Sequence, residues 1–212
     1  MTIGIAEVLP FAIGVAISPV PIIAVILMLF SSRATVNGPM FLIGWAVALA
    51  VVSGVAFLAG DAVSESTTAD AVSWSQVLFG GLFVVLAVRT WSKRAPAGEA
   101  PEPPTWMAGI DSFSPVKALT LALLLAGVNP KNLLLAAGAG GAVAGLGLPT
   151  TEAVVSLAAF VIVASTSIAV PVIYVLVGGE GARTRLDTVK EWLAVHNDAV
   201  MTVLFLVLGV NL

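Results

Sequence analysis

Two short motifs in this 212-residue chain place polar side chains next to proline inside long apolar stretches. The first is Ser18-Pro19-Val20-Pro21, and the second is Asn129-Pro130-Lys131-Asn132. Proline in a helix interior removes a backbone hydrogen bond and pushes the preceding residue out of the helical region. Serine and asparagine are preferred helix N-caps, and proline is favoured at the first helical position. We therefore predict that a helix breaks at Pro19 and Pro21, that another breaks at Pro130, and that a capped half-helix begins at each place.

The start of a helix carries unpaired N–H groups and about half a positive unit charge, so it attracts anions. Lys131 adds a full charge beside the second break, and it follows Lys117 by 14 residues, roughly 21 Å of helical rise. A lone charge at that depth in a membrane marks a functional candidate. We predict a substrate-binding centre for an anion, built from Ser18, Asn129, Lys131 and Asn132. The alternative is an ordinary proline kink with a lysine that snorkels to the interface.

A second set of polar residues could line a path to this centre. It comprises Ser53 in one apolar stretch and Ser165, Thr166 and Ser167 in another. Hydroxyls of this kind also bond the preceding carbonyls of their own helix, or they pack against a neighbouring helix. We favour the packing role and keep path lining as the alternative.

The composition indicates what kind of protein must position these residues. Hydrophobic residues make up 59% of the chain and charged residues 10%, and the mean hydropathy of +1.08 excludes a soluble enzyme. A net charge of −3 leaves no basic face for nucleic acid. With no cysteine and one histidine, we expect no metal site and no cofactor. No catalytic base, nucleophile constellation or nucleotide-binding signature is visible, so we expect no enzyme activity.

Six uncharged, mostly apolar stretches follow one another along the chain. They cover residues 8–32, 34–60, 71–88, 118–151 (interrupted only by Lys131), 153–179 and 199–212. A helix needs about 20 residues to cross the ~30 Å hydrocarbon core, and the first five stretches suffice. The sixth is short, so we expect either that its helix begins earlier, near Trp192, or that the native chain continues past Leu212. The sequence predicts an all-α integral membrane protein with six transmembrane helices, of which the first and fourth are broken at proline.

The chain also divides into two similar halves, because Asn129-Pro130 follows Ser18-Pro19 by 111 residues. Each half would hold three helices, so the second would lie upside down relative to the first, as in the inverted repeats of many transporters. A proline-rich link with a composition typical of extended chain separates the halves. We predict a first repeat over residues 1–92, a cytoplasmic loop over 93–115 and a second repeat over 116–212.

The basic residues predict the orientation in the membrane. Apart from Lys131, all of them fall on one side of the predicted helices, namely Arg33, Arg89, Lys93, Arg94, Lys117, Arg183, Arg185 and Lys190. The other side holds acidic residues, such as Glu7 and Glu152, and no lysine or arginine. By the positive-inside rule, the basic side is cytoplasmic and both termini lie outside the inner (plasma) membrane.

These features resemble a known family. The Ser-Pro-x-Pro motif at Ser18, the polar turn from Arg33 to Gly38, the proline-rich loop and Asn129-Pro130-Lys131 are similar to the GAP family of small actinobacterial membrane proteins, within the lysine-exporter superfamily. The resemblance implies a role in moving or addressing cell-envelope glycolipids, such as glycopeptidolipids or sulfolipids, to the surface. The wider superfamily exports amino acids and cations.

We therefore expect a membrane transporter or export facilitator for an anionic envelope (glyco)lipid or its precursor. Its partners would be membrane lipids and the anionic glycolipid or a small anionic solute. It could also form an oligomer or join an envelope-lipid export complex. Two alternatives stay open. One is an amino-acid or small-solute exporter of the same fold, and the other is a non-transporting scaffold subunit in which Lys131 would be dispensable.

Overall fold

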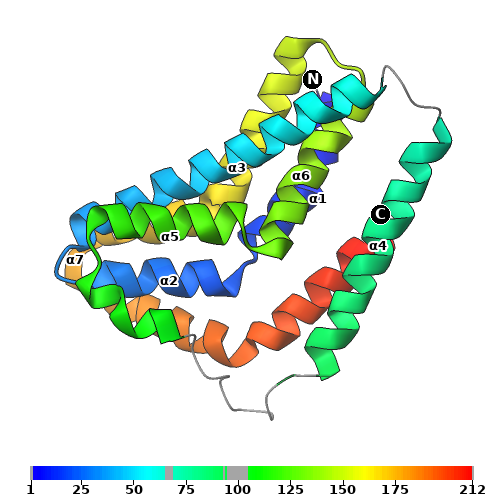
Figure 1. Ribbon diagram of the computed structural model, residues 1–212. Coiled ribbons are helices and arrows are strands. Elements are labelled where there is room, and N and C mark those ends of the chain that lie inside the picture. The colour runs from blue at the N-terminus through cyan, green and yellow to red at the C-terminus, as the bar shows by residue number, and fades with distance from the viewer. Residues whose placement is uncertain (1, 65–68, 93, 95–104, 212) are drawn as a thin grey trace.

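The computed structural model describes residues 2–64, 69–92, 94 and 105–211 (Figure 1). Its elements are α1 (Thr2–Ala16), α2 (Pro19–Phe30), α3 (Ala34–Ser64), α4 (Ala69–Ser92), the 3-10 helix η1 (Thr105–Ser112), α5 (Pro115–Gly127), α6 (Pro130–Gly145) and α7 (Thr150–Asn211). Over these residues the chain contains helices and no strand. The predicted all-α architecture is confirmed.

Helix α7 consists of two arms joined at a kink. Gly179 has φ 58° and ψ −138°, a conformation that glycine adopts because it has no Cβ. The first arm is Thr150–Gly179, and the second arm, residues 180–211, turns back along the molecule (Figure 1). The helix that we expected to begin near Trp192 therefore begins just after Gly179. Charged residues at helical spacing support its first turns, as in the ion pair of Lys190 with Asp187.

Several described helices have the length and composition of membrane spans. Ala34–Gly60 within α3 and the first arm of α7 are each long and apolar enough to cross a membrane. Two further spans arise if each bent pair of helices counts as one, α1 with α2 bent by 58° and α5 with α6 bent by 65°. The described part of the chain thus has two to four candidate spans, which indicates a membrane protein but is fewer than the six predicted from the sequence.

Both interruptions predicted from the proline motifs are confirmed. Helix α1 ends at Ala16 and α2 begins at Pro19, while α5 ends at Gly127 and α6 begins at Pro130. The residues before the prolines have ψ angles of 100° at Ser18 and 121° at Asn129. Such extended values are what a following proline imposes, so each break arises from the local sequence.

Helix α3 packs against both halves of the second bent pair. A Cβ added at Gly44 of α3 would lie 2.6 Å from the carbonyl oxygen of Leu119 in α5, and one added at Gly140 of α6 would overlap the carbonyl oxygen of Ser53 in α3. Small residues let membrane helices approach this closely. Backbone contact with α3 therefore holds both α5 and α6 in place.

The end of the central link packs on the helices. Residues 95–104 lie outside the described residues, but residues 105–112 form η1, so the extended conformation expected for the whole link is wrong there. Met107 and Ile110 are buried, and η1 contacts α2. The amide of Asn37 also donates to the carbonyl oxygen of Phe113 at 2.9 Å. These apolar side chains give the segment a surface to bury, which its prolines and glycines suggested it lacked.

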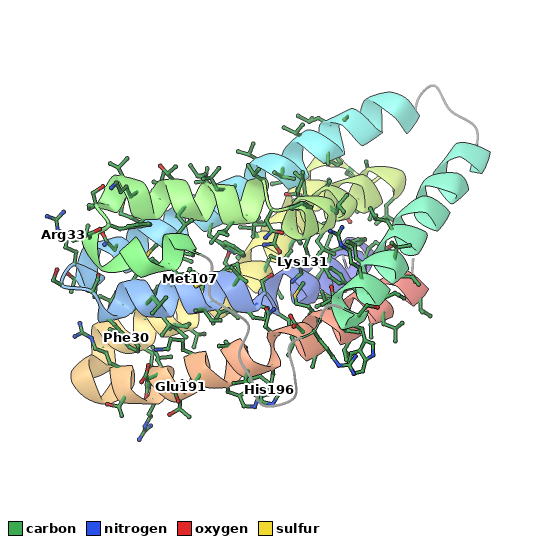
Figure 2. All side chains as sticks on the ribbon, turned by 60° about the horizontal axis from the view of Figure 1, so that its bottom comes forward. Phe30, Arg33, Met107, Lys131, Glu191 and His196 are labelled. Carbon is green, nitrogen blue, oxygen red and sulfur yellow. The ribbon has the colours of Figure 1, made fainter. Side chains whose placement is uncertain are left out.

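Basic side chains gather at one end of the molecule, which we call the basic end. It includes Arg33 after α2, Lys117 at the start of α5 and Lys190 after the kink of α7. Lys190 Nζ lies 5.4 Å from the centre of the Phe30 ring, so the second arm of α7 reaches the end of α2. Figure 2 shows Phe30 and Arg33 at this end and Lys131 near the middle.

Candidate functional site

Lys131 lies where the two helix breaks meet (Figure 2). Its Nζ donates to Ser18 Oγ at 2.7 Å and to the carbonyl oxygen of Ile17 at 3.3 Å. Ser18 and Ile17 form the break between α1 and α2, while Lys131 is the second residue of α6. The contact between Lys131 and Ser18 therefore joins two motifs that are 113 residues apart in the sequence.

The contact extends into a buried hydrogen-bond network. Ser18 Oγ donates to Asn132 Oδ1 at 3.0 Å, and Asn132 Nδ2 donates to the carbonyl oxygen of Leu125 at 2.8 Å. The exposed fractions are 3% for Ser18, 6% for Lys131 and 1% for Asn132. We call these three side chains the polar centre. It ties both bent pairs of helices together at their breaks.

The two cap residues play different roles. Asn129 caps α6 as predicted, because its side chain accepts a hydrogen bond from the Lys131 backbone N–H at 3.1 Å. The same prediction for Ser18 is wrong, since its side chain makes no capping bond. Pro19 and Pro21 have no N–H group that could donate to the Ser18 hydroxyl. The hydroxyl instead accepts a hydrogen bond from Lys131 and donates one to Asn132.

The ammonium of Lys131 is buried without a counter-charge in the described part of the chain. Its two oxygen partners there, a hydroxyl and a main-chain carbonyl, are both neutral. An ammonium has three N–H donors, so one of them is left over. Burying a charge in an apolar surrounding is costly unless it is paired. When it is protonated, Lys131 therefore has both a charge and a free donor to offer to an anion.

Four helix ends surround this ammonium, because α2 and α6 begin here and α1 and α5 end here. Val20 is the second residue of α2 and Asn132 is the third residue of α6, so their N–H groups have no acceptor within those helices. No backbone acceptor for them occurs elsewhere among the described residues. At the opposing ends, the carbonyls of Ile17 and Leu125 are bound by Lys131 and Asn132. The free N–H groups of Val20 and Asn132 favour an anion, while the remaining carbonyls at the ends of α1 and α5 act against it.

Sequence reasoning did not identify the carbonyls of Ile17 and Leu125 as part of the site. Both residues contribute only main-chain oxygens, which any residue type would supply. The available signal was their position, because the last carbonyls before a helix break lose their helical partners and must find others.

The four residues considered as path lining do not join the polar centre. Ser53 Oγ donates to the carbonyl oxygen of Leu49 at 2.8 Å, and Thr166 Oγ1 donates to that of Val163 at 2.7 Å. Such bonds within one helix are the usual alternative to a role in a path. The hydroxyls of Ser165 and Ser167 are buried and have no hydrogen-bond partner among the described residues. Path lining by all four residues stays a prediction.

Residues 8–212 match the model of the family described as Sap, sulfolipid-1-addressing protein. This match includes both proline motifs and every residue of the polar centre. No curated protein and no solved structure matches the chain.

Proposed function

The chain belongs to the Sap, sulfolipid-1-addressing protein family, and from that premise we propose that it moves an anionic envelope lipid, or its precursor, across the inner membrane. Membership suggests an involvement in sulfolipid export. The proposal adds that the lipid passes through this chain and that its head group binds at the polar centre. The partners are then membrane lipids and the anionic lipid itself, and the role requires no enzyme activity.

The buried ammonium of Lys131 carries this proposal. It lies between the two helix breaks, and no described carboxylate forms an ion pair with it. Two opposite unit charges 4 Å apart attract by about 4 kcal/mol at an effective dielectric of ~20, but by about 1 kcal/mol in bulk water. A sulfate or phosphate head group would supply the missing counter-charge in a buried site, where the attraction between opposite charges is stronger than in water.

We further propose that the helices form six membrane crossings. These are the bent pair α1–α2, α3, α4, the bent pair α5–α6, and the two arms of α7. The last three would repeat the first three in inverted orientation, as in many secondary transporters. The two breaks support this repeat, since Ser18 and Asn129 hold equivalent positions before α2 and α6. In such folds one half moves against the other around a site near the midplane.

Cysteine labelling tests the orientation, for which we place the basic end in the cytoplasm. The chain has no cysteine of its own. Ser32 is exposed at the basic end, and Thr150 is exposed at the start of α7, at the far end of its first arm. A membrane-impermeant maleimide should label Thr150→Cys in intact cells and Ser32→Cys only after permeabilisation. The reverse result would invert the topology.

A lipid-translocation assay tests the function. The full chain is reconstituted in vesicles that carry a fluorescent sulfatide (sulfated galactosylceramide) or the same lipid without its sulfate, with and without an imposed proton gradient. We expect the protein to raise the sulfatide translocation rate about tenfold or more over protein-free vesicles, a difference of roughly 1.4 kcal/mol. The neutral lipid should stay at the protein-free rate. Equal rates for both lipids would refute anion selection, and no acceleration of either lipid would favour the scaffold role.

A further inference from the structure

An apolar groove of about 740 Å³ runs between α1 and the second arm of α7. On α1 it extends from Ala6 to Ile17, and on α7 it extends from Trp192 to Val207. The stretch of α1 that lines the groove is about 16 Å long, close to half the thickness of the ~30 Å hydrocarbon core. The groove is therefore about as long as the acyl region of one membrane leaflet.

One end of the groove adjoins the polar centre. Ile17 lines the groove, while its carbonyl oxygen accepts the hydrogen bond from Lys131 Nζ. Helix α1 and the second arm of α7 run in opposite directions (Figure 1), so the early residues of the second arm that line the groove, Trp192 and His196, lie at its Ile17 end. A molecule in the groove would thus have one end beside the buried ammonium.

The groove is polar only toward this end. The rings of Trp192 and His196 stack with their centroids 4.6 Å apart, and His196 Nδ1 lies 2.8 Å from the carbonyl oxygen of Trp192. Tryptophan and histidine combine an apolar body with a polar tip, as suits a boundary between polar and apolar surroundings. Between this pair and Val207, the lining on α7 is aliphatic. The groove is thus polar at one end and apolar along the rest of its length, as an amphiphilic lipid is.

The lining of the groove favours an acyl chain as its occupant. Among the described residues, no charged side chain lines the groove, and Ile17 places one of its ends beside Lys131. An acyl chain joined to an anionic head group matches both features.

We infer that this groove binds an acyl chain of the transported lipid while the anionic head group lies at the polar centre. The inference rests on the proposed function and adds to it a tail site and an entry route from the bilayer. A lipid would enter between α1 and the second arm of α7, so that its head group reaches Lys131 while its tail stays in apolar surroundings.

Photocrosslinking with hexadecyl sulfate tests this inference. One probe carries a diazirine next to the sulfate, and the other carries it near the methyl end. The full chain is labelled in phosphatidylcholine vesicles, and the sites are mapped by mass spectrometry. We expect the sulfate-end probe to label residues around Ile17 and His196. The methyl-end probe should label residues around Ala6 and Val207.

Two tryptophan variants of the second arm provide a matched comparison. Val203 lines the groove and is 62% exposed, while Leu206 does not line it and is 51% exposed. Val203→Trp should fill the groove and lower methyl-end labelling about fivefold, equivalent to about 1 kcal/mol. Leu206→Trp should leave the labelling unchanged. Lys131→Met should lower labelling by the sulfate-end probe alone.

The contrary outcomes distinguish a failure of the tail site from a failure of the anion site. Labelling that Val203→Trp does not reduce, or that is equally strong around Leu206, would overturn the groove as a tail site. If groove labelling meets the expectation but Lys131→Met leaves the sulfate end unaffected, the tail site stands and the anion site of the proposed function fails. If Lys131→Met lowers labelling by the sulfate-end probe but Val203→Trp leaves labelling by the methyl-end probe unchanged, the tail site is refuted and the anion site stands.

Discussion

Lys131→Met is expected to lower delivery of the anionic lipid about a hundredfold or more while leaving the protein folded. Removing one partner of a buried charge pair typically costs 2–5 kcal/mol, and about 3 kcal/mol corresponds to that factor. Methionine keeps much of the length and the apolar stem of lysine, and the bond between Ser18 Oγ and Asn132 Oδ1 does not depend on the ammonium. The measurement is sulfatide translocation, with the amount of folded protein determined in parallel.

The same substitution should leave the thermal stability of the lipid-free protein unchanged or raise it. Lys131 is buried with neutral partners, so the substitution removes a charge whose desolvation opposes folding. A gain in stability together with a loss of transport is typical of a residue that serves function and lowers the stability of the folded protein. A purely structural lysine would instead lower both quantities when replaced.

Lys131→Arg is the matched control for charge. It keeps the positive charge but replaces a compact ammonium with a planar guanidinium, so its transport rate should lie between those of wild type and Lys131→Met. If well-folded Lys131→Met protein delivers the lipid at the wild-type rate, the anion site is refuted. The scaffold role should then replace it.

Gly140→Ala is expected to have the largest effect on stability. A Cβ at this position would overlap the carbonyl oxygen of Ser53 and lie 2.9 Å from the backbone nitrogen of Phe57. These atoms belong to the backbone of α3, so no side chain can rotate away, and α6 must shift as a whole. Overpacking of this kind costs about 1–3 kcal/mol, occasionally more. We expect a clear drop in the thermal unfolding midpoint of the purified protein.

Gly141→Ala controls for the change of residue type. The two glycines are adjacent in α6, but a Cβ at Gly141 would meet no atom within 4 Å. Alanine favours a helix over glycine by about 1 kcal/mol, so this variant should be neutral or slightly stabilising. Equal midpoints for the two variants would show that the close contact between α3 and α6 does not limit stability.

The kink at Gly179 was not predicted from the sequence. Glycine pairs occur both at Gly178-Gly179 and at Gly140-Gly141. Only the first pair contains a positive φ angle, while the second continues through α6 without a break. Glycine permits such a turn without requiring it, so the choice depends on how the two arms of α7 pack.

By itself, the sequence determined the properties that depend on neighbouring residues. Long uncharged stretches imply membrane helices, and the prolines after Ser18 and Asn129 break their helices because proline acts on its own turn and on the residue before it. Only the tertiary structure decided which groups meet at the breaks. It brought Lys131 to the hydroxyl of Ser18 across 113 residues, took that hydroxyl away from capping, and placed the apolar groove beside Ile17. These contacts depend on how whole helices pack, which no local pattern encodes.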